Sequence, residues 1–305
     1  MSINALNWKI EKRPLFDKGG NELPVFGTFR SDNNNFLGTV TGRYTIIQNE
    51  ELFKLGESLA AEDRSVKLIS SGEINGGQQV FVKFSLPHEI DILKKGDLVR
   101  TELMISTKHD GTGSLIPRVM SRRLICLNGA TVPVNTIVSS IRHSLSADEK
   151  LIEMGQLLSN VSEEIKTFGN VSNQLARVVL PKEEVGEIIQ SVYYKDESNN
   201  LVTSVQKQNQ ARNVLSIYDN NDDNKIPEIK NTAWALYNSF TRFVDHNMSF
   251  RIGGSENDEQ AKIRGILFGA GESLKMRVFY EIIRIIKKNH SIEVPEHYLT
   301  GTKSE

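Results

Sequence analysis

The period of the hydrophobic pattern changes near residue 145 of this 305-residue chain. Before that point, short apolar runs alternate with Gly-, Asn- and Asp-rich turns, as is typical of strands joined by hairpins. Beyond it, apolar residues recur every three or four positions, as in amphipathic helices. The sequence therefore predicts an α+β fold, with an N-terminal antiparallel β-sheet region containing one or two helices over residues 1–144 and a mostly helical region over residues 145–305.

Turn-forming residues divide the first region into hairpins. The Asn-rich run at residues 31–35 is expected to close a hairpin between Pro24–Arg30 and Phe36–Val40. A further strand is expected over Arg43–Ile47, and Gly76-Gly77 is expected to form the turn of a second hairpin.

Capping and first-turn residues mark the beginnings of the helices. The expected beginnings are an N-cap at Asn49, a capping box from Ser146 to Glu149, a first-turn proline at Pro181, an N-cap at Thr232, and Lys262. The first of these helices is expected to end near Ala61 and the Pro181 helix near Tyr193. The last should reach Lys288, with an interruption at Gly269-Ala270-Gly271.

Composition narrows the class of protein. The net charge of −1 argues against a histone-like binder of nucleic acid, although it leaves room for a local basic surface. With a single cysteine, Cys126, the chain cannot form an intramolecular disulfide, so a reducing compartment is expected. Its start does not read as a signal peptide, and no apolar run approaches the roughly 20 residues that span a bilayer. We therefore expect a cytoplasmic protein with no membrane association, located in the host cytoplasm if a phage encodes it.

A local excess of basic residues falls between Arg100 and His143. Six basic and two acidic side chains give this stretch a charge of +4. On a strand, Arg118 and Arg122 share one face because side chains repeat every second residue, whereas Arg123 points the other way. A basic sheet face can follow a phosphate backbone, but arginines also protect edge strands from pairing, and both interpretations stay open.

The connection that contains Lys108 and His109 has two interpretations as well. Gly111 and Gly113 would let the backbone approach a phosphate closely, or the segment is simply a hairpin turn. Tyr44 could stack on a base or belong to the core. The candidate residues for nucleic-acid binding are therefore Arg118, Arg122, Arg123, Lys108, His109, Arg142 and Tyr44.

Motifs that specify a reaction or a metal are missing from the sequence. Asp219, Asn221 and Asp223 have the spacing of the first calcium ligands of an EF-hand, but Asn224 and Lys230 stand where glycine and glutamate are needed. The six histidines lack zinc-type spacing. We expect no catalytic residues, no metal and no cofactor.

Short motifs spread over most of the chain resemble those of the phage- and plasmid-associated family known as domain of unknown function 932. The matching residues are Arg43-Tyr44 with Gln48-Asn49, Gly76-Gly77 with Val80-Phe81-Val82, His109-Asp110-Gly111, Arg123 with Cys126-Leu127-Asn128-Gly129, Arg142-His143, Trp234-Ala235-Leu236-Tyr237-Asn238 with Asp245-His246, and Leu267-Phe268-Gly269 with Leu274-Lys275. The resemblance implies a mobile-element context near replication and recombination genes, and it supplies no catalytic residue.

These observations favour a non-enzymatic protein that binds single-stranded DNA in recombination or annealing and works as a homo-oligomer. The helical region would then serve packing or oligomerisation. An alternative is a protein-interaction factor that acts on a host or phage replication or recombination protein. A third hypothesis, a nucleotide-processing enzyme, would use His109, Asp110 and His143, and no known catalytic spacing supports it.

Overall fold

The computed structural model describes residues 6–62, 65–124, 129–131, 161–194, 201, 204–220, 224, 226–250 and 259–300. The chain folds into two compact units. Unit 1 comprises residues 1–88, 101–120 and 136–162; unit 2 comprises residues 89–100, 121–135 and 163–305. The sequence-based boundary at residue 144 lies outside the described residues.

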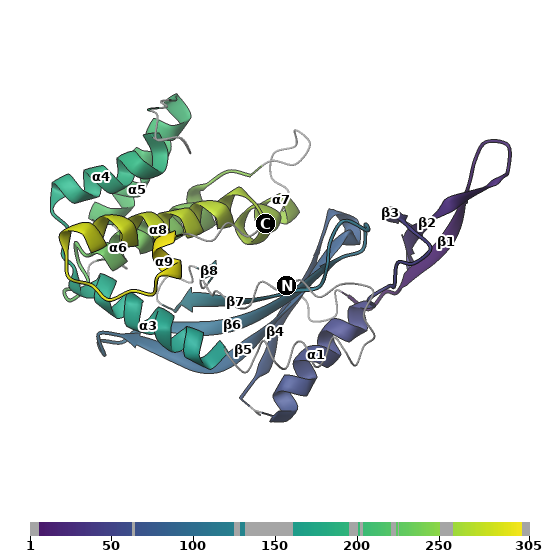
Figure 1. Ribbon diagram of the computed structural model, residues 1–305, viewed down its shortest axis with the longest axis horizontal. Helices are drawn as coiled ribbons and strands as arrows, with labels where there is room; N and C mark the ends of the chain where they lie inside the picture. Colours follow the sequence, from purple (N-terminus) through teal and green to yellow (C-terminus); the bar gives the residue numbers. More distant parts are fainter. Residues whose placement is uncertain are drawn as a thin grey trace. The chain divides into compact units, whose positions relative to one another are not determined.

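Unit 1 contains a three-stranded antiparallel sheet made from β1 (Ile10–Phe16), β2 (Glu22–Arg30) and β3 (Phe36–Val40) in that order. Its β1–β2 hairpin extends away from the rest of the unit (Figure 1). The predicted Asn-rich turn between β2 and β3 is confirmed: Asn34 has φ +60° there, and the N–H of Arg30 donates to the carbonyl of Asn35.

The strand predicted over Arg43–Ile47 is wrong, because this segment has no strand structure. The ammonium group of Lys12 on β1 instead takes up the carbonyls of Gly42 and Tyr44, at 2.6 and 3.2 Å. A side chain thus satisfies backbone groups that a neighbouring strand would otherwise have bonded.

A second sheet has the order β4-β5-β6-β7-β8. Its strands are β4 (Lys67–Ile74), β5 (Gln79–Ile92), β6 (Asp97–Lys108), β7 (Ile116–Arg123) and β8 (Gly129–Thr131). The 3-10 turn η1 (Asn75–Gly77) joins β4 to β5, which confirms the predicted hairpin. Gly77 has φ +101°, and a Cβ there would lie 2.8 Å from the Trp8 ring, so this turn requires glycine. Strands β5, β6 and β7 each contribute residues to both units.

Helix α1 (Asn49–Glu62) begins at the predicted place but with a different cap. The carboxylate of Glu51 accepts a hydrogen bond from the N–H of Gln48, which puts Gln48 in the capping position. The side chain of Asn49 instead makes tertiary bonds: it donates to the carbonyl of Trp8 and bonds the ring of His109. The prediction of an Asn49 cap is therefore wrong, because distant partners use its amide.

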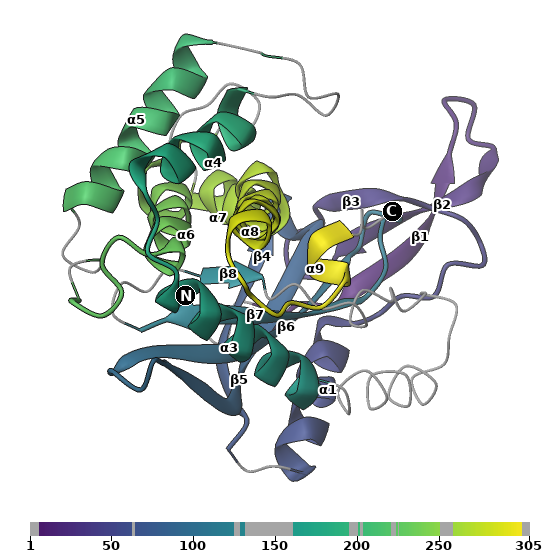
Figure 2. The same cartoon turned by 60° about the vertical axis from the view of Figure 1, so that its left-hand side comes forward.

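Most of the described helices follow residue 160, as predicted, and those of unit 2 lie together in both views (Figures 1 and 2). The described helices are α3 (Val161–Arg177), which begins in unit 1, α4 (Lys182–Tyr194), α5 (Val205–Asn220), α6 (Ala233–Arg242), the π-helical turn η3 (Phe243–Asn247), α7 (Glu259–Phe268), α8 (Ala270–Asn289) and α9 (His297–Thr300). The fold is therefore α+β, with an antiparallel sheet region followed by a mostly helical one.

Several predicted helix boundaries are confirmed in unit 2. Thr232 caps α6 by accepting a hydrogen bond from the N–H of Ala235, and α4 begins one residue after Pro181. The last predicted helix breaks at Gly269, where α7 ends and α8 begins. A Cβ on Gly271 would lie 2.7 Å from the carbonyl oxygen of Gly265, so the close approach of α8 to α7 requires glycine at this position. The capping box predicted at Ser146 lies outside the described residues.

The core of unit 2 is aromatic. Phe279 of α8 contacts Phe168, Tyr237 and Tyr298, with ring centroids 5.2–5.8 Å apart. All four rings are buried. Such offset and edge-to-face pairs add about 0.5–1.5 kcal/mol each beyond the burial of their apolar area. None of the described helices is both long and apolar enough to cross a bilayer.

Candidate nucleic-acid interface

His109 belongs to unit 1 and is fully buried. Its Nε2 bonds Oδ1 of Asn49 at 2.9 Å, and its ring meets the Trp8 ring edge-on at 5.8 Å. Its main chain joins the two sheets, since its N–H donates to the carbonyl of Gln78 and its carbonyl accepts from Oγ1 of Thr28. The expectation that His109 meets a phosphate is therefore corrected: the ring is enclosed, and its bonds hold the sheets together.

Tyr44 and Lys108 are brought together as neighbours. The hydroxyl of Tyr44 donates to the carbonyl of Lys108 over 3.2 Å, and both residues are half-buried. Burial, and secondarily the charge of Asp110, raise the pKa of the Tyr44 phenol, so it stays neutral at physiological pH. The alkyl chain of Lys108 lies over Gly113, where a Cβ would be 2.9–3.0 Å from its carbons. A stacking role for Tyr44 stays a prediction.

The three arginines of β7 differ in burial. Arg118 in unit 1 and Arg122 in unit 2 are half-buried, and both interact with other groups of the chain. Arg123 in unit 2 is only 2% exposed, and its Nε donates to Oδ1 of Asp97 over 2.6 Å. Arg123 therefore does not present its guanidinium to solvent, which corrects its assignment as a phosphate contact. Phosphate contacts by Arg118 and Arg122 stay predictions.

Neither the last candidate for DNA binding nor the complete proposed catalytic group is covered by the structure. Arg142 and His143 lie outside the described residues, so the hypothesis of an enzyme built on His109, Asp110 and His143 stays untested. Within the described part of the chain, no group of three or more His, Cys, Asp or Glu side chains is arranged to hold a metal ion.

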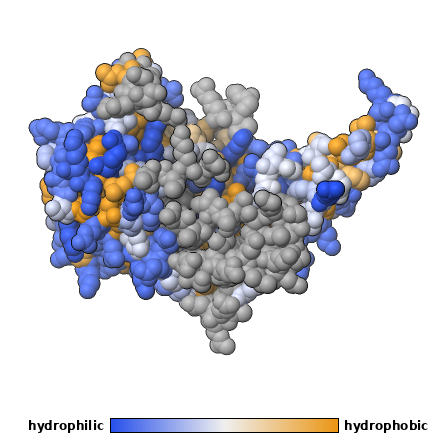
Figure 3. Space-filling model, viewed as in Figure 1, coloured by the Kyte–Doolittle hydropathy of each residue, from blue (hydrophilic) through white to orange (hydrophobic). Residues whose placement is uncertain are grey.

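One face of the three-stranded sheet carries aromatic side chains toward solvent. Cross-strand pairing places Glu11 and Arg13 of β1 on the same face as Gly27 and Phe29 of β2, and Phe36 of β3 pairs with Phe29. The opposite face is inward: its Thr28 and Arg30 are buried. We call the face that carries Glu11, Arg13, Gly27, Phe29 and Phe36 the outward face. Figure 3 shows apolar side chains among hydrophilic ones on the β1–β2 hairpin.

The outward face has an ordered arrangement of rings and charge. The Phe29 ring lies over Gly27, where a Cβ would be 2.5 Å from the ring. The guanidinium of Arg13 lies 4.9 Å from the centre of that ring, within the range of a cation–π contact. Phe36, which is 52% exposed, meets Phe29 edge-on at 5.4 Å. Glu11 and Asn34 orient the guanidinium at 2.6 and 2.9 Å.

Sequence reasoning identified the strand Pro24–Arg30 but missed this face. The available signal was the cluster of aromatic residues around a glycine, with basic residues on the preceding strand. Alternation alone did not say which face would be outward, because Thr28 and Arg30 are held inward by partners 81 and 43 positions away in the chain.

Unit 2 joins two of the motifs that carried the family resemblance. Lys275 of α8 forms a buried ion pair with Asp245 of the π-helical turn η3. Burial lowers the pKa of the Lys275 ammonium, and the Asp245 carboxylate opposes that shift. The pair links the end of α6 to α8 in the unit that also holds the aromatic core.

The described architecture defines an α+β protein with an exposed sheet face that carries aromatic rings and the Arg13–Glu11 ion pair. By sequence the chain belongs to the family described as Domain of unknown function (DUF932), whose model matches residues 36–266. No curated protein and no solved structure matches the chain.

Proposed function

We propose that this chain is a non-enzymatic protein that binds single-stranded DNA and acts in recombination or annealing of a phage or other mobile element. The outward face of the three-stranded sheet is the surface that we assign to binding the DNA strand. One observation carries the proposal: Arg13 lies over the ring of Phe29, which contacts the half-exposed ring of Phe36. Proteins that bind single strands combine positive charge with aromatic rings on which bases stack.

The chemistry of this face suits an unpaired strand better than a duplex. Unpaired bases expose their π-faces, and each base stacked on an aromatic side chain contributes about 1–3 kcal/mol. The ion pair between Arg13 and Glu11 is exposed at both side chains, 39% and 46%, and such pairs contribute at most about 1 kcal/mol. A phosphate can therefore replace Glu11 at the guanidinium at low cost.

The β1 edge of this sheet is protected against pairing with another β-strand. Both backbone groups of Ile10 are bonded to the side-chain amide of Gln48, at 2.9 Å each. Pro14 on the same strand has no N–H to donate, which blocks strand addition further along. The β1 edge is thus closed to strand addition, whereas the outward face is open to a ligand.

The proposal retains some of the DNA contacts predicted from the sequence and excludes others. Arg118, Lys108 and Tyr44 of unit 1 and Arg122 of unit 2 are half-buried, and each stays a candidate contact with DNA. Arg123 and His109 are left out because their side chains are buried. A homo-oligomer in the cytoplasm remains part of the proposal, since single-strand binding is commonly cooperative along the strand.

Fluorescence anisotropy with a labelled single-stranded oligonucleotide of about 30 residues tests the proposal. Wild-type protein should bind at low salt, and Arg13→Ala with Phe36→Ser should weaken binding by roughly 10- to 100-fold. Lys54→Ala is the matched control: Lys54 is an exposed cation of the same unit, paired with Glu50 at 2.6 Å. No binding at low salt, or equal binding by the double variant and the wild type, contradicts the proposal.

A protein-interaction role is the alternative, and the same face could serve it because exposed apolar side chains also mark protein contacts. Light scattering after size exclusion distinguishes the two. If Phe36→Ser changes the oligomeric state while no single-stranded DNA is bound, the face is a protein contact.

A further inference from the structure

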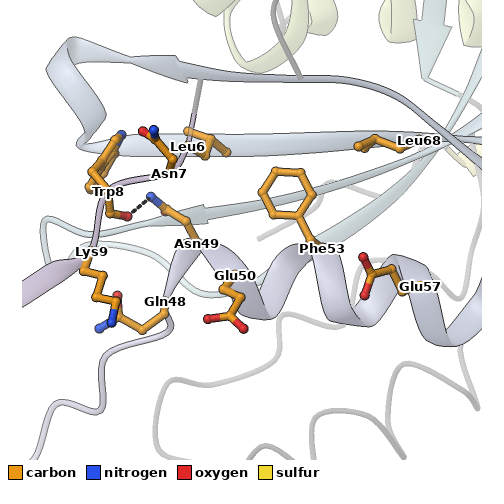
Figure 4. A pocket seen from close by; sticks show the side chains of 10 residues that line it. All are labelled: Leu6, Asn7, Trp8, Lys9, Gln48, Asn49, Glu50, Phe53, Glu57 and Leu68. Atoms are coloured by element: carbon orange, nitrogen blue, oxygen red, sulfur yellow. Dashed lines mark hydrogen bonds between the residues drawn. The ribbon is translucent and has the colours of Figure 1, made fainter. Parts of the chain in front are cut away.

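A pocket of about 600 Å³ lies in unit 1 beside α1 and the segment that leads into β1 (Figure 4). Its lining residues come from the N-terminal segment, α1 and β4: Leu6, Asn7, Trp8, Lys9, Gln48, Asn49, Glu50, Phe53, Glu57 and Leu68. Leu6, Trp8, Phe53 and Leu68 supply the apolar part of the lining, and the volume falls in the range of sites for small organic ligands.

Most of the polar groups in the lining are already committed within the protein. The amide of Gln48 bonds both backbone groups of Ile10, and the amide of Asn49 is shared between Trp8 and His109. Glu50 is paired with Lys54. The exposed side chains of Lys9 and Glu57, in contrast, form no ion pair with another described residue. A ligand would therefore meet the unpaired charges of Lys9 and Glu57 beside the Glu50–Lys54 ion pair.

These two charges lie at opposite ends of the pocket. Lys9 lies beside Gln48 at the start of α1 (Figure 4). Glu57 follows Glu50 by seven residues, which is two helical turns or roughly 10 Å along the axis. Phe53 is three residues after Glu50 and four before Glu57, so along α1 it lies between the two charges, and its ring points toward Leu6 and Leu68 (Figure 4).

We propose that this pocket binds a nucleoside monophosphate and that guanine is the preferred base. The ammonium of Lys9 would pair with the phosphate, and the ring of Phe53 would stack on the base. The carboxylate of Glu57 would accept hydrogen bonds from the N1–H and the N2 amino group of guanine. Guanine presents these two donors side by side, which matches the two oxygens of a carboxylate.

The pattern of charge favours this ligand class over simpler ones. An organic cation would be attracted by Glu57 but repelled by Lys9. A plain anion would be attracted by Lys9 but repelled by Glu57. Adenine and uracil present no matching pair of donors to a carboxylate. The proposal rests on the pocket alone and is independent of single-strand binding by the outward face.

Isothermal titration of the full chain with mononucleotides tests the inference. Guanosine monophosphate should bind with a Kd of about 0.1–1 mM, and inosine monophosphate, which lacks the N2 amino group, about tenfold more weakly. Lys9→Ala should weaken guanosine monophosphate about tenfold without changing the affinity for guanosine. Glu57→Gln should remove the preference over inosine monophosphate.

Two exposed residues of the same unit provide controls for the charge changes. Lys18→Ala and Glu22→Gln alter the β1–β2 hairpin and should leave the titration unchanged. The inference is overturned if no mononucleotide gives saturable heat up to a few millimolar, if all bases bind equally, or if benzylamine binds in place of nucleotides. Loss of single-stranded DNA binding with an intact nucleotide titration would count against the proposed function alone.

Discussion

Arg123 donates from Nε to Oδ1 of Asp97 over 2.6 Å, and both residues are buried in unit 2. The second carboxylate oxygen of Asp97 accepts from Nε1 of Trp234, and the guanidinium also reaches Asn224. A basic residue that looked suited to a phosphate is thus the centre of an internal network. Its removal should affect stability before it affects binding.

Arg123→Ala should lower the free energy of unfolding by about 3–5 kcal/mol, because it leaves the buried carboxylate of Asp97 without its cation. Denaturant unfolding followed by circular dichroism measures the change. Arg100→Ala is the matched control, since Arg100 pairs with Glu89 at the surface, where both side chains are more than 40% exposed. That variant should lose at most about 1 kcal/mol. Similar losses for the two variants would contradict a structural role for Arg123.

Gly38→Ala should destabilise the protein by about 1–3 kcal/mol. A Cβ at Gly38 would lie 2.5 Å from the Cα and carbonyl oxygen of Asp110, and backbone cannot move aside as a flexible side chain can. Gly186→Ala in α4 has no atom within 4 Å of the new Cβ and should stabilise by about 0.5–1 kcal/mol through helix propensity. Thermal melts of the two variants should therefore shift in opposite directions.

Thr232→Ala should cost about 1 kcal/mol, because Oγ1 of Thr232 accepts the hydrogen bond from Ala235 that caps α6. Thr232→Ser keeps the hydroxyl and should retain most of the stability. Ser58→Ala, which removes an exposed hydroxyl from α1, should change the free energy of unfolding by less than about 0.5 kcal/mol. Chemical denaturation of the three variants measures the differences, and equal loss for alanine and serine at position 232 would argue against the cap.

The salt dependence of single-strand binding should reveal the charge of Arg13. For single strands, each neutralised phosphate contributes about −0.7 to the slope of log K against log salt. Arg13→Ala should make the slope shallower by about that amount. Arg13→Lys should keep the slope but bind more weakly, since an ammonium lacks the planar contact with Phe29. Unchanged slopes across the series would remove Arg13 from the interface.

Acid stability should depend on Glu281. Burial raises the pKa of its carboxyl, but hydrogen bonds from Arg284 and Ser191 outweigh burial, and the result lies below the ordinary value of 4.5. A lowered pKa in the folded state gives a contribution that is present above pH 4.5 and lost as the pH falls through the folded value. Glu281→Gln should therefore lose less stability than the wild type between about pH 5 and pH 3. Denaturant midpoints across this range test the difference, and parallel curves would contradict it.

Local pattern was sufficient for most of the elements. The Asn-rich turn before β3, the Gly76-Gly77 hairpin, the Thr232 cap and the break at Gly269 follow from backbone preferences that operate within a few residues. The segment Arg43–Ile47 has strand composition but no strand, because Lys12 bonds the carbonyls of Gly42 and Tyr44 where the strand would begin. Asparagine is a favourable N-cap residue, but the side-chain amide of Asn49 bonds Trp8 and His109, which are distant in the sequence.

The sequence by itself determined the α+β class, the order of hairpins and helices, and the family, since periodicity and turn chemistry are encoded over short distances. Only the tertiary structure decided which basic and aromatic side chains face water. Arg123 is buried by a carboxylate 26 positions away, and His109 by an amide 60 positions away. Arg13, Phe29 and Phe36 are left outward because the opposite face of their sheet is covered. Exposure depends on contacts between residues far apart in the chain, and composition carries no record of them.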